Sequence, residues 1–235
     1  MRDGQIIVTG GSRGIGQAIA EQLAAAGFAV AVLSRSGTAT AGYGLACDVA
    51  DETSLVEAIR SVAERAPIIG LVNNAGFHES HSSSSLSVAD FERTMRVNTT
   101  AAVIASREVY PHLKASGGGV ILNIGSFFDR LGVAENVAYC ASKAAVGALT
   151  RCLAVEWAPD GIQVLNIAPG YIETDLNRDF LVKPKAQEWV RRRIPVARPG
   201  QPEEIAKLVL GFFERPVAFL TGETIYVDGA QGLNQ

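Results

Sequence analysis

The stretch QIIVTGGSRGIGQAIA (residues 5–20) joins a strand-length apolar run to a helical pattern through a glycine-rich turn. Gly10, Gly14 and Gly16 permit a tight turn and a close approach of ligand to backbone. The start of the following helix offers N–H groups and positive potential to a pyrophosphate. The spacing G-x3-G-x-G differs from the general fingerprint G-x-G-x-x-G, so an ordinary strand-to-helix turn is the alternative. Its place in the first strand–helix unit favours a dinucleotide-binding fold.

Other strand-length apolar runs follow, and helical patterns separate most of them. The full set is QIIVTG, AVAVLS, GLACDV, IIGLVNNAG, GVILNIGS, IQVLNIAPG and ETIYVDG. Strands that alternate with helices and are apolar on both faces predict a parallel sheet covered on both sides. We therefore expect an α/β fold in a single domain, residues 1–235. It is a Rossmann-type doubly wound parallel sheet of about seven strands with helices on both faces. Between Arg35 and Cys47 the chain is too short for a crossover helix, so a loop is expected there.

Composition and charge narrow the classes of protein. The net charge of −3 argues against nucleic acid or an anionic membrane as a partner. No apolar run reaches the roughly 18 to 20 residues of a membrane span, and the beginning of the chain has no secretory signal pattern. The chain has three cysteines, Cys47, Cys140 and Cys152, and no two of them have CxxC spacing. Because their number is odd, any set of disulfides leaves one cysteine unpaired. Free thiols and a cytoplasmic location are the expectation.

The end of the second strand run indicates which dinucleotide binds. An NAD site usually has a carboxylate about 20 residues past the glycine loop, which binds the ribose 2′-hydroxyl. No acidic residue lies between Glu21 and Asp48; the sequence instead offers Ser34 and Arg35, with Arg13 inside the glycine loop. Two guanidinium groups can form charge-assisted bonds with a 2′-phosphate, although each arginine taken alone could be a solvated surface charge. The sequence predicts NADP(H) as cofactor.

A second stretch, VAYCASKAAVGALT (residues 137–150), predicts a helix with Tyr139 and Lys143 one turn apart on one face. The tyrosine pKa is near 10, and lowering it by roughly three units needs about 4 kcal/mol of preference for the phenolate. A cation at about 4 Å supplies an energy of that order at an effective dielectric near 20. Lys143, helped by an oxidised nicotinamide, is thus expected to lower the pKa of Tyr139 and make it a general acid and base. A structural tyrosine beside a snorkelling lysine is the alternative.

Several motifs occur together in this order: TGGSRGIG, NNAG, RVN, IGS, YCASK and APGYIETD. The set resembles the short-chain dehydrogenase/reductase family from Ile6 to about Gly229. Its nearest branches are the 3-oxoacyl-acyl-carrier-protein reductases and the carbonyl reductases. The resemblance implies an NADP(H)-dependent enzyme that interconverts a carbonyl and a secondary alcohol.

The resemblance also implies the roles of particular residues. Ser126 would hydrogen-bond the substrate oxygen, and Tyr139 would donate the proton. Lys143 would grip the nicotinamide ribose, and Asn98 would hold a water that links Lys143 to solvent. The expected cofactor contacts are Gly10, Ser12, Arg13, Gly14, Ile15, Gly16, Ser34, Arg35, Asp48, Val49, Asn74, Ala75, Gly76, Tyr139, Lys143, Pro169, Gly170, Ile172 and Thr174.

Within that set, Asp48 and Val49 would lie at the adenine, and Ile172 and Thr174 would hold the carboxamide. A homotetramer is implied as well, formed by the helices that contain residues 98–115 and 139–157.

The substrate is less closely specified. A short lid over residues 174–193 is expected, with Phe180 and Leu181 as candidate pocket residues. If Phe127 or Phe128 faces the pocket, a compact or apolar ketone is favoured over a polyhydroxylated one. Of two arginines with which the acyl-carrier reductases dock their acidic carrier, Arg178 matches one, but Gly119 stands in place of the other.

We therefore expect a small free carbonyl or alcohol substrate, with 3-oxoacyl-ACP or -CoA reduction as the alternative. A non-catalytic NADP(H)-binding sensor or scaffold is a further alternative. It is disfavoured because the sequence contains the complete catalytic tetrad that the resemblance implies: Asn98, Ser126, Tyr139 and Lys143.

Three other signals are not interpreted as functional sites. His78 and His81 have H-x-x-H spacing but no clear third ligand, so no metal is expected. Cys140 points about 100° away from Tyr139 around the helix, which is typical of packing. The basic segment WVRRRIP (residues 189–195) is expected to be a solvated or subunit-contact face.

Overall fold

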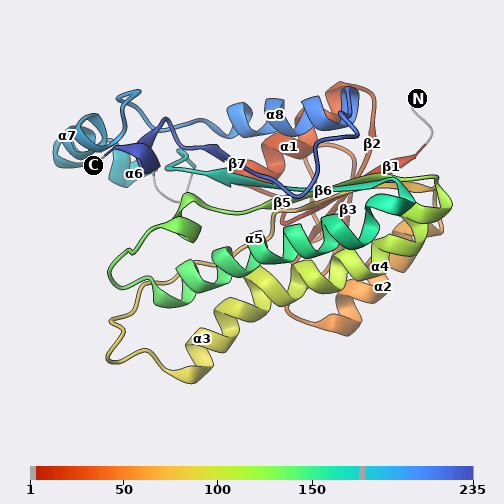
Figure 1. Cartoon of the computed structure of the whole chain (residues 1–235), viewed down its shortest axis with the longest axis horizontal. Coiled ribbons are helices and arrows are strands. Elements are labelled where there is room, and N and C mark those ends of the chain that lie inside the picture. Colours follow the sequence, from red (N-terminus) through yellow and green to blue (C-terminus); the bar gives the residue numbers. More distant parts are fainter. Residues whose placement is uncertain (1–3, 175–177, 235) are drawn as a thin grey trace.

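The expected strands form one parallel sheet in the order β3-β2-β1-β4-β5-β6-β7 (Figure 1). The computed structural model describes residues 4–174 and 178–234, and the side chains of Arg178 and Phe180 lie outside the described part. The strands are β1 (Gln5–Thr9), β2 (Ala29–Ser34), β3 (Tyr43–Ala46), β4 (Ile68–Asn73), β5 (Gly119–Ile124), β6 (Ile162–Pro169) and β7 (Thr224–Val227). The chain moves outward from β1 to β3 and then returns to place β4 on the other side of β1. The connections leave in opposite directions at this point, which opens a crevice at the carboxyl ends of β1 and β4.

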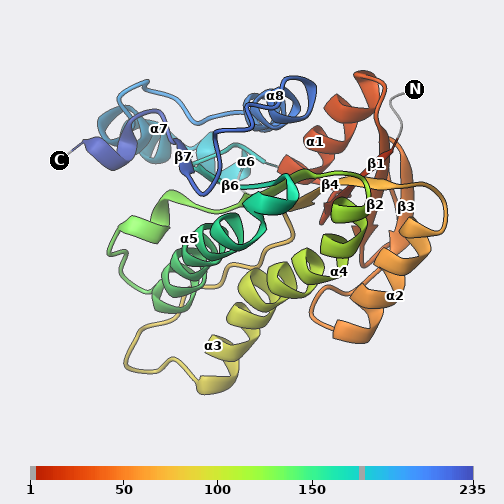
Figure 2. The ribbon, with the colours of Figure 1, turned by 45° about the vertical axis from the view of Figure 1, so that its right-hand side comes forward.

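Helices cover both faces of the sheet, as the apolar runs predicted (Figures 1 and 2). On one face α1 and α8 pack against each other, and on the other face α2 packs against α4 beside α5. The longer helices are α1 (Gly14–Ala25), α2 (Glu52–Ala63), α3 (Val88–Met95), α4 (Ala101–Ala115), α5 (Val137–Trp157), α7 (Pro184–Arg193) and α8 (Pro202–Glu214). The short elements are η1 (Arg96–Thr100), η2 (Phe127–Arg130), η3 (Ala158–Asp160), α6 (Arg178–Leu181) and η4 (Gln231–Leu233).

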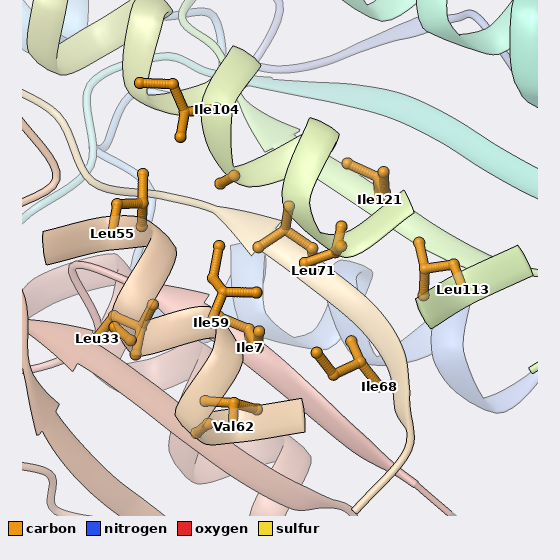
Figure 3. Close-up of a cluster of buried hydrophobic side chains, with 14 of the residues drawn as sticks. Ile7, Leu33, Leu55, Ile59, Val62, Ile68, Leu71, Ile104, Leu113 and Ile121 are labelled. Atoms are coloured by element: carbon orange, nitrogen blue, oxygen red, sulfur yellow. The ribbon is translucent and has the colours of Figure 1, made fainter. Parts of the chain in front are cut away.

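Alternation along each strand sends side chains to two separate cores. On β1, Ile6 and Val8 join the cluster under α1 and α8, whereas Ile7 joins the cluster under α2 and α4. Figure 3 shows the second cluster, where Ile59 of α2 and Leu113 of α4 lie against the sheet. Burial on both faces explains why the strands are almost continuously apolar.

The connection from β2 to β3 contains no helix, as its length predicted. Gly42 has φ +74°, and a Cβ there would lie 2.2 Å from the carbonyl oxygen of Val30. Likewise, a Cβ at Gly44 would lie 2.1 Å from the carbonyl oxygen of Gly37. Glycine therefore lets this loop fold tightly back along the edge of β2.

The segment after β6 forms the short helices α6 and α7 at one end of the sheet (Figure 1). Leu181, Val190 and Ile194 make a small apolar cluster, with Tyr171 packed against it. Across the described ranges, 4–174 and 178–234, the helices are too short or too polar to cross a bilayer.

Candidate active site

The residues of the expected tetrad meet beyond the carboxyl ends of β4 and β5. Lys143 is buried, and its Nζ donates to the carbonyl oxygen of Ile124, the last residue of β5, at 2.8 Å. Its Nζ lies 5.7 Å from the ring centroid of Tyr139, and Tyr139 is hydrogen-bonded to Ser126. A Cβ at Gly76 would lie 3.7 Å from Asn98 Oδ1 and 3.8 Å from Lys143 Nζ, so Gly76 sits against both.

Asn98 ties two segments together from an unusual backbone position. It lies in η1, a π-helical turn between α3 and α4, and such turns often occur at functional sites. Its Oδ1 accepts from the backbone N of Phe77 at 2.7 Å. Its Nδ2 donates to Phe77 O at 2.8 Å and to Ser142 Oγ at 3.0 Å. The side chain thus clamps the loop after β4 to α5, a role that the sequence did not reveal.

Burial determines the electrostatics of Lys143 and Tyr139 in the protein chain. Burial lowers the pKa of Lys143 to about 8. Burial also raises the pKa of Tyr139, and the hydrogen bond from Ser126 only partly opposes this increase. In the protein chain alone the pKa of Tyr139 is therefore raised, and the lowering that we predict for Lys143 together with an oxidised nicotinamide stays a prediction. Desolvation of the phenolate is the main cause, and Lys143 is itself desolvated and bonded to Ile124.

The glycine loop and the NNAG turn are locked to each other. Asn74 Nδ2 donates to the carbonyl oxygens of Thr9 and Gly10 at 3.0 and 3.1 Å. Thr9 Oγ1 accepts from the backbone N of Asn74 and of Ala75 at 3.0 and 3.1 Å. A Cβ at Gly10 would lie 2.8 Å from Ala75 Cα, so only glycine fits there. Asn74 and Ala75 therefore support the loop, and Thr9 is a structural contributor that was not foreseen.

The start of α1 is suited to bind a phosphate. Arg13 is its N-cap and provides no side-chain cap, and the first turn contains no acidic residue. The first N–H groups of the helix are therefore available to an anion. Ile15 and Gly16 lie in this first turn, and Thr174 comes within 3.5 Å of a Cβ placed on Gly14. These residues fit a dinucleotide pyrophosphate.

The end of β2 gathers hydroxyl groups beside an arginine. Ser34 Oγ lies 3.3 Å from Ser36 Oγ, which lies 2.7 Å from Thr38 Oγ1. Arg13 and Arg35 are exposed, and neither forms an ion pair within the described residues. This arrangement fits a 2′-phosphate, and Ser36 and Thr38 extend the set that the sequence suggested.

The remaining expected cofactor contacts lie around the same crevice. Asp48 Oδ1 accepts from the backbone N of Ala50 at 3.0 Å in the turn that carries Val49. Pro169 ends β6, and a Cβ at Gly170 would lie 2.7 Å from Asp228 Cα. Ser12 lies in the glycine loop, and Ile172 is buried and pairs with Gly200 in an isolated bridge.

An aromatic wall flanks Tyr139. The Phe128 ring centroid lies 5.8 Å from that of Tyr139 and 6.3 Å from that of Tyr171. Phe127 is buried behind it, 5.6 Å from Tyr171, and Trp189 of α7 lies 4.9 Å from Tyr171. Phe128 thus contacts the phenol ring of Tyr139, whereas Phe127 is mainly a core residue.

Some candidate pocket residues are placed differently from what the sequence suggested. Leu181 is buried in the cluster with Val190 and Ile194, so it is not in the aromatic wall. Phe180 and Arg178 have side chains outside the described part. Tyr171 and Trp189 were missed, because their contact with this site depends on how the segment after β6 folds.

The two histidines of the H-x-x-H pattern bind different partners. His78 Nε2 lies 2.6 Å from Asn136 Oδ1. His81 Nε2 lies 3.4 Å from Glu79, in a group with Asp90 whose carboxylates both contact Arg93. The guanidinium of Arg93 thus provides the positive charge that neutralises the carboxylates of Glu79 and Asp90. The free thiols Cys47, Cys140 and Cys152 range from buried to exposed.

Known proteins are similar to this chain in sequence and fold. A family model described as enoyl-(acyl carrier protein) reductase matches residues 10–232. The chain is 34% identical to the 3-oxoacyl-[acyl-carrier-protein] reductase MabA of Mycobacterium tuberculosis over 97% of this chain and 92% of that protein.

Two solved structures extend the likeness to the fold. One is a gluconate 5-dehydrogenase of Burkholderia cenocepacia in complex with NADP and tartrate. It is 31% identical with a TM-score of 0.90, over 99% of this chain and 96% of that one. A short-chain dehydrogenase/reductase of Serratia marcescens has a TM-score of 0.89 at 29% identity, over 98% of both chains.

The glycine loop, the doubly wound sheet and the juxtaposed tyrosine, lysine, serine and asparagine agree with these likenesses along almost the whole chain. The chain is an enzyme, an oxidoreductase, and it belongs to the short-chain dehydrogenase/reductase family.

Proposed function

We propose that the enzyme interconverts a carbonyl and a secondary alcohol with Tyr139 as general acid and base. The observation that supports this most directly is the hydrogen bond of Tyr139 to Ser126 beside the buried Lys143, at the crevice of the sheet. A phenol and a serine hydroxyl that bind each other can both bind one substrate oxygen. Tyr139 then gives or takes the proton, and Ser126 stabilises the charge that develops on the oxygen.

The cofactor is NADP(H), which when bound supplies or accepts the hydride. The chain's own residues bind it: the first turn of α1 at the pyrophosphate, and Lys143 at the nicotinamide ribose. Arg13, Ser34 and Arg35 contact the 2′-phosphate, with Ser36 and Thr38 beside them. Lys143 and Ser126 hold the phenol of Tyr139, and the positive charge of an oxidised cofactor bound beside them would further stabilise the phenolate. Asn98 fixes the loop at Phe77 to the helix that carries Lys143, and it positions a water through which Lys143 regains its proton.

The assignment of the 2′-phosphate site has a direct test. Arg35→Ala is expected to weaken NADPH binding by about tenfold or more, because it removes a charge-assisted contact that NADH does not make. Affinity for NADH should change by less than about threefold. The two dissociation constants can be measured by cofactor fluorescence, with Arg65→Ala, on the turn after α2, as a matched control. Equal losses for both cofactors would contradict the assignment.

The aromatic wall favours a compact or apolar ketone. Phe128 contacts Tyr139, so a substrate carbonyl bound to that phenol lies beside an apolar ring. A 3-oxoacyl-ACP or -CoA substrate is the second candidate, supported by the identity to MabA. Gly119 argues against a docked carrier, because a Cβ there would lie 2.7 Å from Leu113 and 2.8 Å from Ile69 O. A long basic side chain has no room at this position.

A substrate panel separates these candidates. NADPH oxidation is followed with short 3-oxoacyl thioesters and with free ketones of similar size. We expect turnover of ketones to exceed that of thioesters, because Gly119 replaces one of the two arginines that would receive an acidic carrier. Thioester turnover well above that of the ketones would establish the acyl reductase. Tight NADPH binding without turnover of either class would favour the non-catalytic sensor or scaffold.

We also propose that the chain is one domain, residues 1–235, with residues 174–193 as a substrate lid. The homotetramer that the resemblance implies is supported by exposed apolar residues on the two long helices. Val103 of α4 is 41% exposed and Val155 of α5 is 81% exposed. Pairing with helices of a second copy would cover them. A cytoplasmic location is part of the same proposal.

A further inference from the structure

His78 lies against the catalytic tyrosine, although the mechanism above does not use it. Its ring centroid is 4.8 Å from that of Tyr139, and the two planes meet at 83°. This edge-on contact places the imidazole ring directly beside the phenol that is proposed to bind the substrate carbonyl. His78 also remains exposed to solvent, so a ligand can reach it.

The position of His78 is held from both sides. The residue before it, Phe77, has its backbone N and O bonded to Asn98 of the tetrad. On the other side, His78 Nε2 lies 2.6 Å from Oδ1 of Asn136, the N-cap of the helix that carries Tyr139. Asn136 is buried and follows Glu135, which has a φ of +63°. A non-glycine residue in this region is strained, and such strain is often found where a side chain is positioned for function.

The hydrogen bonds also determine which nitrogen of His78 carries a proton. Asn136 Nδ2 donates to the carbonyl oxygen of Ala134 at 2.7 Å. The atom of Asn136 that faces His78 is therefore its oxygen, an acceptor. His78 Nε2 must be the donor in this pair, and in the neutral imidazole Nδ1 is left as an acceptor. Among the side chains that the structure describes, none provides a partner for Nδ1.

The tyrosine thus contacts two rings of different chemistry. Phe128 presents an apolar ring and His78 presents a hydrogen-bond acceptor, each roughly perpendicular to the Tyr139 ring. A ketone has two substituents, and each of these rings can receive one of them. A hydrogen-bond acceptor beside the carbonyl favours substrates in which one substituent carries a hydroxyl group. Without such a hydroxyl, the acceptor nitrogen would have no donor in the complex.

We propose that His78 is a specificity-determining residue that accepts a hydrogen bond from a hydroxyl next to the carbonyl. The preferred substrate class is then an α-hydroxy ketone, or the corresponding diol, with its other substituent apolar. This rests on the proposed carbonyl chemistry and refines its substrate. The hydroxyl donates to Nδ1 while Nε2 donates to Asn136.

The test compares ketones in pairs whose two members differ by one heavy atom. In 2-hydroxyacetophenone a hydroxyl replaces the terminal methyl of propiophenone, while the phenyl group is the same. Hydroxyacetone and butanone form a smaller matched pair. The wild-type enzyme is expected to prefer the hydroxy ketone of each pair in kcat/KM by about tenfold or more.

The variants separate recognition from structural support. His78→Leu should lower kcat/KM for the hydroxy ketone at least tenfold more than for its methyl partner. His78→Gln should keep most of the preference, because its amide can donate to Asn136 and accept from the substrate. Phe128→Ala, the matched control, should affect both aromatic ketones together, because they share the phenyl group.

An equal loss on both ketones in His78→Leu would show a structural role only and overturn the inference. Wild-type turnover of other ketones but of none of these four would also overturn it, while the proposed carbonyl chemistry would stand. Absence of turnover with every ketone and thioester would count against the proposed function itself, and the inference would fall with it.

Discussion

Tyr139→Phe is expected to lower kcat/KM for carbonyl reduction by a factor of about 10² to 10⁴, the usual contribution of a positioned general acid. The change removes the hydroxyl that is bonded to Ser126 but keeps the ring that packs on His78 and Phe128. The fold and the cofactor site should therefore persist. Steady-state NADPH oxidation and NADPH binding, measured on the same preparation, separate loss of chemistry from loss of structure.

The matched control is Tyr110→Phe. Tyr110 donates its hydroxyl to Asp160 Oδ2 at 2.6 Å, on α4 and away from the crevice. The Tyr110→Phe variant also loses one tyrosine hydroxyl, but at a position away from the active site. Its turnover should therefore stay within about twofold of the wild type. If Tyr139→Phe kept more than about a tenth of wild-type kcat/KM, the role of Tyr139 as proton donor would be wrong.

Lys143→Met is expected to abolish turnover and, separately, to change how stability depends on pH. The pKa of Lys143 is lowered to about 8 by burial, whereas an unfolded lysine has a pKa near 10.4. Between these two values the unfolded chain binds more protons than the folded chain, so the free energy of unfolding of the wild type rises with pH. The cost of burying the charge is present below pH 8 and fades toward pH 10.

Relative to the methionine variant, the wild type should therefore gain about 2 kcal/mol of unfolding free energy between pH 7 and pH 10. Urea unfolding of both proteins at several pH values in this range measures the difference. Tyr139 is present in both, so its own raised pKa largely cancels. Lys207→Met, on the outer side of α8, controls for the removal of one lysine. A pH-independent difference between wild type and Lys143→Met would show that burial does not shift Lys143.

The architecture could be predicted because its signals are local. Each strand is a continuous apolar run, so all seven were found, and the loop between β2 and β3 followed from chain length alone. Tyr139 and Lys143 share a helix face, so their proximity needs no knowledge of the rest of the fold. The glycine loop likewise follows from its place directly after the first strand.

Contacts between distant segments could not be predicted in the same way. His78 reaches Asn136 across a separation of 58 residues, and Tyr171 reaches Trp189 through the folding of α7. No periodicity in the sequence encodes these contacts, because loops determine them. The π-turn at Asn98 also gave no local signal, since its hydrogen bonds depend on the loop at Phe77.

The sequence by itself determined the α/β fold and the family, and it predicted the four polar residues that the structure brings together. Only the tertiary structure decided how these residues behave. It buries Lys143 against Ile124, raises the pKa of Tyr139, and places one polar and one apolar ring beside the phenol. Residue types and spacing are properties of the chain, whereas desolvation and hydrogen-bond partners depend on which other segments fold against each group.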